Sequence, residues 1–194
     1  CNKRPVYPEG FVQTNIGELS ARISGTEKAD DYLLRGGFYL SSGDYPAAIA
    51  DFSAITAREP DNLLALFNLA NARMMMYDYI ESVDDKTPRV VGERPNEIRK
   101  VDYSLVLEGY RRCLEIDPDF VFARFNIGNV YAKNGEIDKA IEAYTQVIRQ
   151  DRELAEAYFN RGLLYIYIGQ KAQASADLSK AGELGITSVY NIIK

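Results

Sequence analysis

The stretch FNIGNVYAKNG, residues 125–135, decides the fold. Its apolar residues recur at the spacing of an amphipathic helix, and Asn134-Gly135 breaks that helix. A second helical pattern then runs from Ile137 to Ile148. The sequence therefore predicts two helices joined by a tight turn.

This helix pair recurs along the chain in one register of 34 residues. Residues 121–154 and 155–188 are consecutive copies, and residues 29–62 are an earlier copy. The copy between them, residues 63–120, is longer by 24 residues, which we assign to an insertion near residues 78–101. We predict four repeats, with the insertion at the turn between the two helices of the second repeat.

Three positions in each repeat support this register. Two antiparallel helices approach closely only where little side chain lies between them, so small residues are expected at the crossing and a bulky residue beside it. Val106 departs from this pattern, because the other repeats carry Ala at its position. The eighth positions are Gly36, Ala70, Gly128 and Gly162, the twentieth are Ala48, Val106, Ala140 and Ala174, and the twenty-fourth are Phe52, Tyr110, Tyr144 and Leu178.

The pattern resembles the tetratricopeptide-repeat family, whose unit is a 34-residue helix–turn–helix. The motifs that carry the resemblance are ALFNLANA at 65–72, residues 125–135, AIEAY at 140–144 and AYFNRG at 157–162. The resemblance covers residues 29–188 and implies an all-α fold, a right-handed α–α superhelix of the bacterial type.

The remaining segments complete the predicted organisation. Residues 1–28 are expected to form an N-terminal leader that is not a domain, and residues 189–194 a C-terminal capping helix over the last core layer. Within the insertion, the first helix is expected to continue to Glu81 and the second to begin at Ile98, with a loop over residues 82–96. That loop is either part of a binding face or a surface excursion of low entropic cost.

Composition excludes several classes of chemistry. The chain has no His, so neither a Ser–His–Asp mechanism nor a His-ligated metal site can be built from it. Its 23 Lys and Arg against 28 Asp and Glu give a net charge of −5, which is atypical of nucleic-acid binding. Cys113 is expected to fill the core. We therefore predict a protein that is not an enzyme and that uses no cofactor, no metal and no small-molecule substrate.

The resemblance implies where a partner would bind. In the family, the first helix of each repeat lines a concave groove through its second, fifth, ninth, twelfth and thirteenth positions. The aromatic and apolar residues there would bury a partner's side chains, and Asn71 and Asn129 would hold its backbone. The predicted groove residues are Leu64, Phe67, Asn71, Met74, Met75, Phe122, Phe125, Asn129, Lys133, Phe159, Leu163 and Tyr167.

The predicted function is a protein–protein interaction scaffold that holds a peptide or partner segment in this groove. The alternative is a structural domain of a larger bacterial envelope-associated protein whose own chain fills the groove, since an exposed apolar face is either used or covered. The family's carboxylate clamp is disfavoured, because Leu33 and Gly37 stand where it needs Lys and Asn.

Cys1 leaves the location open. A cut from a longer chain would also begin without Met, whereas a mature bacterial lipoprotein begins with an acylated Cys. The sequence therefore leaves two locations open: the cytoplasm, or the periplasm or outer membrane as a lipoprotein if Cys1 is a processed N-terminus. Contact with a membrane is expected only if Cys1 is lipidated. The sequence names no partner, pathway or oligomeric state.

Overall fold

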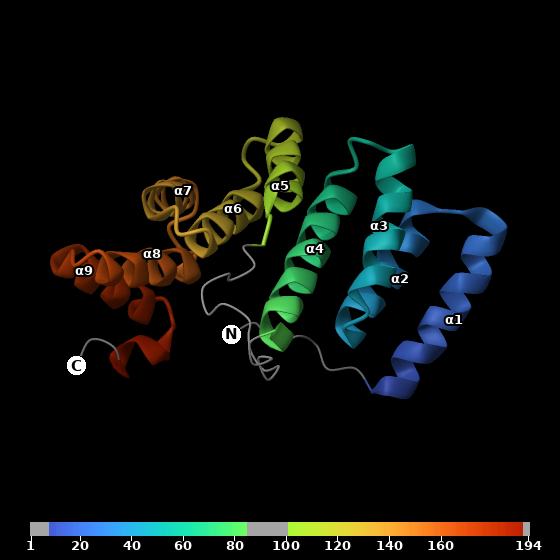
Figure 1. The fold of residues 1–194 in the computed structure, drawn as a ribbon, viewed down its shortest axis with the longest axis horizontal. Helices are drawn as coiled ribbons and strands as arrows, with labels where there is room; N and C mark the ends of the chain where they lie inside the picture. The colour runs from blue at the N-terminus through green and yellow to red at the C-terminus, as the bar shows by residue number, and fades with distance from the viewer. Residues whose placement is uncertain (1–7, 85–100, 192–194) are drawn as a thin grey trace, which may run out of the picture. The chain divides into compact units, whose positions relative to one another are not determined.

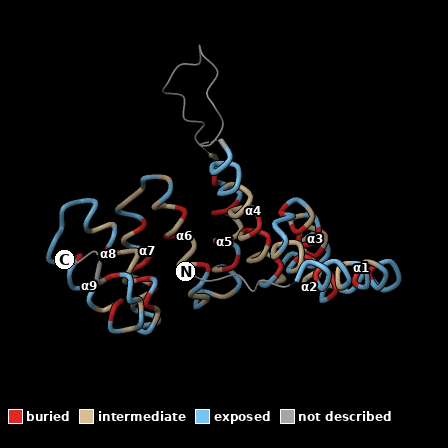
Figure 2. The backbone as a smooth tube through the Cα atoms, turned by 90° about the horizontal axis from the view of Figure 1, so that it is seen from below, coloured by how far each residue is buried: buried red, intermediate tan, exposed pale blue. Residues whose placement is uncertain are grey.

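The computed structural model describes residues 8–84 and 101–191. Every regular element in these ranges is helical, and the expected all-α class is confirmed (Figure 1). The chain divides into two compact units, residues 1–109 and residues 110–194, which are described separately. In both units, buried and exposed residues alternate along the helices, as amphipathic helices require (Figure 2).

The described residues of the first unit form four helices and the beginning of a fifth. They are α1 (Glu9–Thr26), α2 (Ala29–Ser42), α3 (Tyr45–Arg58), α4 (Leu63–Asp84) and the start of α5 (Ser104–Ile116). Helices α1, α2 and α3 each pack against the next helix along the chain. Their core contains Phe52 and Ile55 of α3 between Tyr32 of α2 and Leu69 of α4.

The described residues of the second unit form the end of α5 and four further α-helices. They are α6 (Val121–Lys133), α7 (Ile137–Gln150), α8 (Ala155–Tyr167) and α9 (Lys171–Glu183), followed by a 3-10 helix, η1 (Thr187–Asn191). Helices α6 to α9 again pack in chain order. Gly135 and Gly169 follow α6 and α8 with φ of 74° and 77°, a left-handed conformation that favours glycine at a helix end.

The close approach expected at the eighth position is present within the helix pairs. A Cβ atom added to Gly128 of α6 would lie 2.7 Å from Cε1 of Tyr144 in α7, and one added to Gly162 of α8 would lie 3.0 Å from Cγ of Leu178 in α9. In the α4–α5 pair the contact is between Ala70 and Gly109, again with 3.0 Å from an added Cβ. The small residues therefore permit the helix spacing that the core requires.

Three expected boundaries differ from the structure. Residues 9–26 of the leader form α1, a helix that buries Val12, Leu19 and Ile23. Helix α4 continues to Asp84, beyond the expected end at Glu81, and residues 101–103 are not helical, so α5 begins at Ser104. Polar residues at several positions weaken the helical spacing of apolar residues in α1, so the sequence did not indicate this helix.

The expected capping helix is a short 3-10 turn in the described part of the chain. η1 ends at Asn191, and residues 192–194 lie outside the described residues. Val189 of this turn is buried against Leu178 and Ala181 of α9. The turn therefore covers the last core layer, as a cap does, although it is not an α-helix.

Two ion pairs recur at the same place in two helix pairs. The guanidinium of Arg35 in α2 donates two hydrogen bonds to Asp51 in α3, with N···O distances of 2.8 and 2.6 Å, and a third to Ser20 in α1. Arg161 in α8 binds Asp177 in α9 in the same way, at 2.7 and 2.8 Å. Its third bond goes to Thr145 in α7.

These pairs occupy the seventh and twenty-third positions of the 34-residue register. The α4–α5 pair has Leu69 and Gly109 at these positions, and the α6–α7 pair has Ile127 and Ala143. The described helix pairs are therefore of two kinds, with either a buried ion pair or smaller uncharged residues at the same place. Because Ser20 of α1 replaces Thr145 of α7 in this arrangement, α1 packs on α2 as α7 packs on α8.

A candidate partner-binding face

The exposed face of α6 carries four of the predicted groove residues. Phe122 is 51% exposed, and Lys133 is exposed at the end of the helix. Phe125 is half-buried, with its ring centroid 5.6 Å from that of Tyr144 in α7. Phe125 therefore contributes both to the surface and to the packing of α6 on α7.

Helix α8 continues this surface with three more residues. Leu163 is 38% exposed and Tyr167 is 77% exposed, one helical turn apart on the same side of the helix. Phe159, one turn before Leu163, is half-buried and packs against the cluster of Leu178, Ala181 and Val189. We call this surface the α6–α8 face, and it comprises Phe122, Phe125, Asn129, Lys133, Phe159, Leu163 and Tyr167.

A hydrogen-bond network joins α6, α7 and α8 beneath this face. The carboxamide oxygen of Asn129 accepts from the Tyr144 hydroxyl at 2.7 Å and from the Asn160 amide at 3.0 Å. The Asn129 amide donates to Asn126 at 3.2 Å. Burial raises the pKa of Tyr144 to about 12, so its hydroxyl remains a donor well into the alkaline range.

Asn129 therefore has a structural role in addition to the predicted contact with a partner's backbone. Its oxygen already accepts two hydrogen bonds, so a partner's backbone could use only the remaining amide hydrogen. Asn160, which was not among the predicted groove residues, is the residue that connects α8 to α6. The Asn at the sixth and ninth positions of adjacent repeats was the signal that could have indicated this contact.

The other five predicted groove residues lie on α4, in the first unit. Leu64 is 56% exposed, and the remaining four are half-buried. They are described separately from the α6–α8 face because the two sets belong to different units. The α4 residues are Leu64, Phe67, Asn71, Met74 and Met75, and a continuous groove through all twelve predicted residues stays a prediction.

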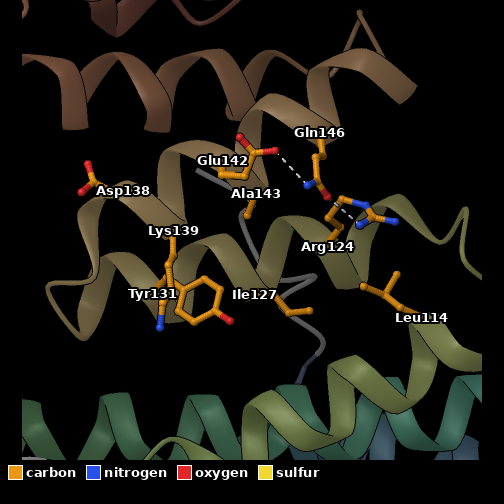
Figure 3. A pocket seen from close by; sticks show the side chains of 9 residues that line it. All are labelled: Leu114, Arg124, Ile127, Tyr131, Asp138, Lys139, Glu142, Ala143 and Gln146. Atoms are coloured by element: carbon orange, nitrogen blue, oxygen red, sulfur yellow. Dashed lines mark hydrogen bonds between the residues drawn. The ribbon is translucent and has the colours of Figure 1, made fainter.

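An open pocket lies between α5, α6 and α7 (Figure 3). It has a volume of about 410 Å³ and is lined by residues of α5, α6 and α7, none of which belongs to the predicted groove. At about 100° per residue, its α6 residues lie on the opposite side of the helix from Phe125 and Asn129. The lining residues are Leu114, Arg124, Ile127, Tyr131, Asp138, Lys139, Glu142, Ala143 and Gln146.

The described residues offer little catalytic chemistry. Cys113 is buried, and burial raises the pKa of its thiol to about 11, so the thiol is not activated as a nucleophile at neutral pH. No group of three or more potential metal-ligating side chains was found among residues 8–84 and 101–191. Over the same ranges, no helix has the length and apolar character needed to span a bilayer.

Family models for tetratricopeptide repeats match four segments of the chain. A model described as TPR repeat matches residues 128–169. Three models described as tetratricopeptide repeat match residues 110–142, 39–75 and 155–184. These segments include parts of every helix from α2 to α9.

Curated relatives match shorter parts of the chain. A photosystem I assembly protein, Ycf3 of Acaryochloris marina, is 32% identical over 83 residues, which are 41% of this chain and 50% of that protein. The CTR9 homolog of Arabidopsis thaliana is 29% identical over 103 residues, 53% of this chain but 9% of that protein. A UDP-N-acetylglucosamine–peptide transferase of Giardia intestinalis, an enzyme, matches over only 6% of its own length. The chain thus covers half or less of each of these proteins.

Solved structures show the same fold over most of the chain. The crystal structure of MamA aligns with a TM-score of 0.72 over 94% of this chain and 93% of that chain, at 20% sequence identity. A thermophilic TPR protein of Thermus thermophilus aligns with a TM-score of 0.69 over 95% and 89%, at 18% identity. These alignments confirm the predicted tetratricopeptide solenoid fold, and at such identities they carry no information on partners.

Proposed function

The chain belongs to the tetratricopeptide-repeat family, and from this premise we propose that it is a protein-interaction scaffold that holds a segment of a partner protein on the α6–α8 face. Family membership supports a role in protein interaction. The choice of this face is our own inference from its geometry.

The observation that carries the proposal is the row of exposed apolar side chains on α6 and α8. Phe122, Leu163 and Tyr167 are all exposed, and Ile166 beside them is 46% exposed. Large apolar side chains gathered on one surface are typical of interaction sites, because single exposed residues are common but contiguous patches are not. Aromatic rings supply contact area at low entropic cost.

The network beneath this row would keep it rigid. Asn129, Tyr144 and Asn160 bond α6, α7 and α8 to one another, so Phe122 and Leu163 project from helices whose separation is fixed. A preformed surface loses less conformational entropy on binding than a flexible one. We expect an extended or helical segment with apolar side chains to bind here, and the row on α4 to provide a second contact surface.

The alternative, a structural domain whose own chain fills the groove, has less support in the described residues. Helix α1 is the described part of the leader, and it bonds to α2 through Asp31 and Arg35. These two residues lie about half a turn around α2 from Leu33, which stands at the fifth position of its repeat, one of the positions that line the groove in the family. α1 therefore extends the row of packed helices at these contacts.

The proposal can be tested by selecting ligands from a library of random dodecapeptides displayed on phage. Selected peptides should bind the wild-type protein in calorimetry and lose about tenfold in affinity for each of Phe122→Ala and Tyr167→Ala, as for central aromatic residues of an interface. Leu105→Ala, which removes an exposed apolar residue of α5, is the control and should bind unchanged. Equal binding to the wild type and to the Phe122→Ala/Tyr167→Ala variant would contradict the proposal.

A further inference from the structure

Two side chains that line the pocket between α5, α6 and α7 are smaller than those at the equivalent positions of the α2–α3 and α8–α9 pairs. In the α2–α3 and α8–α9 pairs, the seventh and twenty-third positions carry the bonded Arg35–Asp51 and Arg161–Asp177. In the α6–α7 pair the same positions carry Ile127 and Ala143, and both line the pocket. The space that the Arg–Asp ion pair occupies in the α2–α3 and α8–α9 pairs is therefore not filled in the α6–α7 pair.

The α2–α3, α6–α7 and α8–α9 pairs all carry a tyrosine at the eleventh position, but the cation beside its ring differs. The guanidinium carbons of Arg35 and Arg161 each lie 5.8 Å from the ring centroids of Tyr39 and Tyr165. Tyr131, the equivalent residue of α6, lines the pocket, and Lys139 from α7 approaches its ring at 5.4 Å. The aromatic wall is thus kept while the internal arginine is absent.

The floor of the pocket is apolar. Leu114, Ile127 and Ala143 line it from three helices, and the last two are each 7% exposed. Since no carboxylate replaces Asp51 or Asp177 at the floor, a guest guanidinium would be desolvated there without a counter-ion, at high cost. The floor therefore favours an apolar side chain, and the volume of about 410 Å³ lies in the range of small binding sites.

The rim carries two carboxylates that the other two pairs lack. Asp138 and Glu142 lie one turn apart on α7 and are exposed (Figure 3). The positions equivalent to them are uncharged in the α2–α3 pair and in the α8–α9 pair. Glu142 accepts a hydrogen bond from the neutral amide of Gln146, and neither carboxylate forms a salt bridge to a cation in the described part of the chain.

One cation of the rim is paired with a carboxylate, and the arginines near it donate to neutral groups. Lys139 is paired with Glu136, and Arg111 donates to the hydroxyl of Tyr131. The guanidinium of Arg124 donates to Gln150, Gln146 and the carbonyl of Pro118. Arg111 and Arg124 bond only to neutral acceptors and so keep their positive charge, whereas Lys139 is neutralised by Glu136. The groups on α7 that a basic ligand can still pair with are Asp138 and Glu142.

From these observations we propose that this pocket is a second docking site, which takes an apolar side chain of a partner protein flanked by Lys or Arg. The apolar side chain enters above Ile127 and Ala143, and the basic residues beside it face Asp138 and Glu142. An apolar anchor in a pocket with a polar rim is the usual arrangement of an energetically dominant contact. The site lies on the side of α6 opposite the α6–α8 face, so it is independent of the proposed function.

Blocked tripeptides provide probes of this site. Because the chain contains no Trp, the fluorescence of Ac-Lys-Trp-Lys-NH2 reports on the peptide alone. We expect its emission to shift to the blue and the amide NMR signals of Ile127, Tyr131 and Ala143 to move saturably. Ac-Glu-Trp-Glu-NH2 should bind about fivefold more weakly, since its charges oppose those of the rim. Ac-Lys-Ala-Lys-NH2 and Ac-Ala-Arg-Ala-NH2 should not move these signals.

Two variants decide the outcome. Ile127→Arg/Ala143→Asp rebuilds the ion pair of the α2–α3 and α8–α9 pairs and should abolish binding by filling the pocket. We call it the filled variant. If that variant does not fold, Asp138→Asn/Glu142→Gln serves instead, and it should remove the preference for the Lys peptide over the Glu peptide. Glu153→Gln/Glu156→Gln removes two exposed acids of the same unit away from the rim and should keep the preference.

Several results would overturn the proposal. One is that millimolar Ac-Lys-Trp-Lys-NH2 does not shift the amide signals of Ile127, Tyr131 and Ala143. Another is that this peptide binds the Ile127→Arg/Ala143→Asp variant as tightly as the wild type. A third is that the wild type prefers Ac-Glu-Trp-Glu-NH2. Binding of Ac-Ala-Arg-Ala-NH2 at the same amides would mean that the pocket takes a guanidinium, which also contradicts an apolar anchor. A wild-type protein that dimerises, with the filled variant monomeric in sedimentation, would assign the pocket to a second copy of the chain.

Discussion

Single residues set the distance between the helices of each pair. Gly128 faces Tyr144, and a Cβ at Gly128 would lie 2.7 Å from that ring, closer than packed atoms approach. Tyr144 is almost completely buried and cannot move toward solvent without breaking its hydrogen bond to Asn129. The small residue is therefore required by the packing and not by backbone conformation.

Gly128→Ala should destabilise the protein by about 1–3 kcal/mol, because it overpacks the contact with Tyr144. Gly37→Ala is a matched control, since Gly37 is also within a helix but has no atom within 4 Å of an added Cβ. That change should be neutral or stabilise by up to about 1 kcal/mol, as alanine favours helix. Urea unfolding measures both, and equal effects of the two substitutions would show that the Gly128 contact is not tight.

Substitutions of Phe125 and Tyr167 should show which residues of the α6–α8 face contribute to the stability of the fold. Phe125→Ala should cost about 2 kcal/mol of unfolding free energy, because half of the side chain packs beside Tyr144. Tyr167→Ala should change it by less than about 0.5 kcal/mol, since the side chain is largely exposed. Thermal unfolding checks this, and a large loss for Tyr167→Ala would mean that the tyrosine is part of the fold.

Tyr144 also makes the stability of the protein depend on alkaline pH. Its pKa is raised to about 12 by burial, above that of an unfolded tyrosine, so the stability it contributes is complete below about pH 10. That contribution is lost as pH rises from 10 toward 12, because the unfolded state releases the proton first. Urea unfolding between pH 8 and 12 should show this decline, and Tyr144→Phe should reduce it. An unchanged pH profile in Tyr144→Phe would assign the decline to other groups.

At the scale of elements, the helix pairs were predicted better than the contacts between them. Small residues at fixed positions and helical spacing are local signals, and they located α2, α3 and α6 to α9. The pairing of Arg161 with Asp177 joins residues 16 apart and required the three-dimensional arrangement. The sequence also could not predict that Asn129 bonds to Tyr144 and Asn160, because an amide at a groove position is equally compatible with a contact to a ligand.

The Arg161–Asp177 pair should matter most when only one partner is removed. Both side chains are largely buried, so Arg161→Ile leaves Asp177 as a buried charge without its partner and should cost about 3–5 kcal/mol. Arg161→Ile/Asp177→Ala copies the Ile127–Ala143 arrangement and should cost less than the single change. Arg112→Ala in the exposed Arg112–Glu115 pair should cost less than about 1 kcal/mol. A double variant that is less stable than Arg161→Ile would contradict this account.

At the scale of the whole molecule, the described helices α1 to α4 and α6 to α9 make their extensive contacts with chain neighbours. An array built in this way has a stability that is close to a sum of local terms. The repeat register in the sequence could predict this architecture. It could not predict the pocket beside α6, which is lined in part by Ile127 and Ala143. A functional difference between repeats is therefore found by comparing equivalent positions, after the register has been established.

Local stability has a direct consequence for a core substitution. Leu178 of α9 is 2% exposed and packs against Gly162, Ala181 and Val189, so Leu178→Ala should remove about 2–4 kcal/mol from its neighbourhood. We expect hydrogen exchange, followed by mass spectrometry, to speed up in peptides from α8 and α9 while peptides from α2 and α3 keep their protection. Ile55→Ala, which removes a residue from the core of the first unit, should give the reverse pattern. If either change instead lowered protection uniformly in both units, the chain would unfold as one cooperative body and the nearest-neighbour account would be wrong.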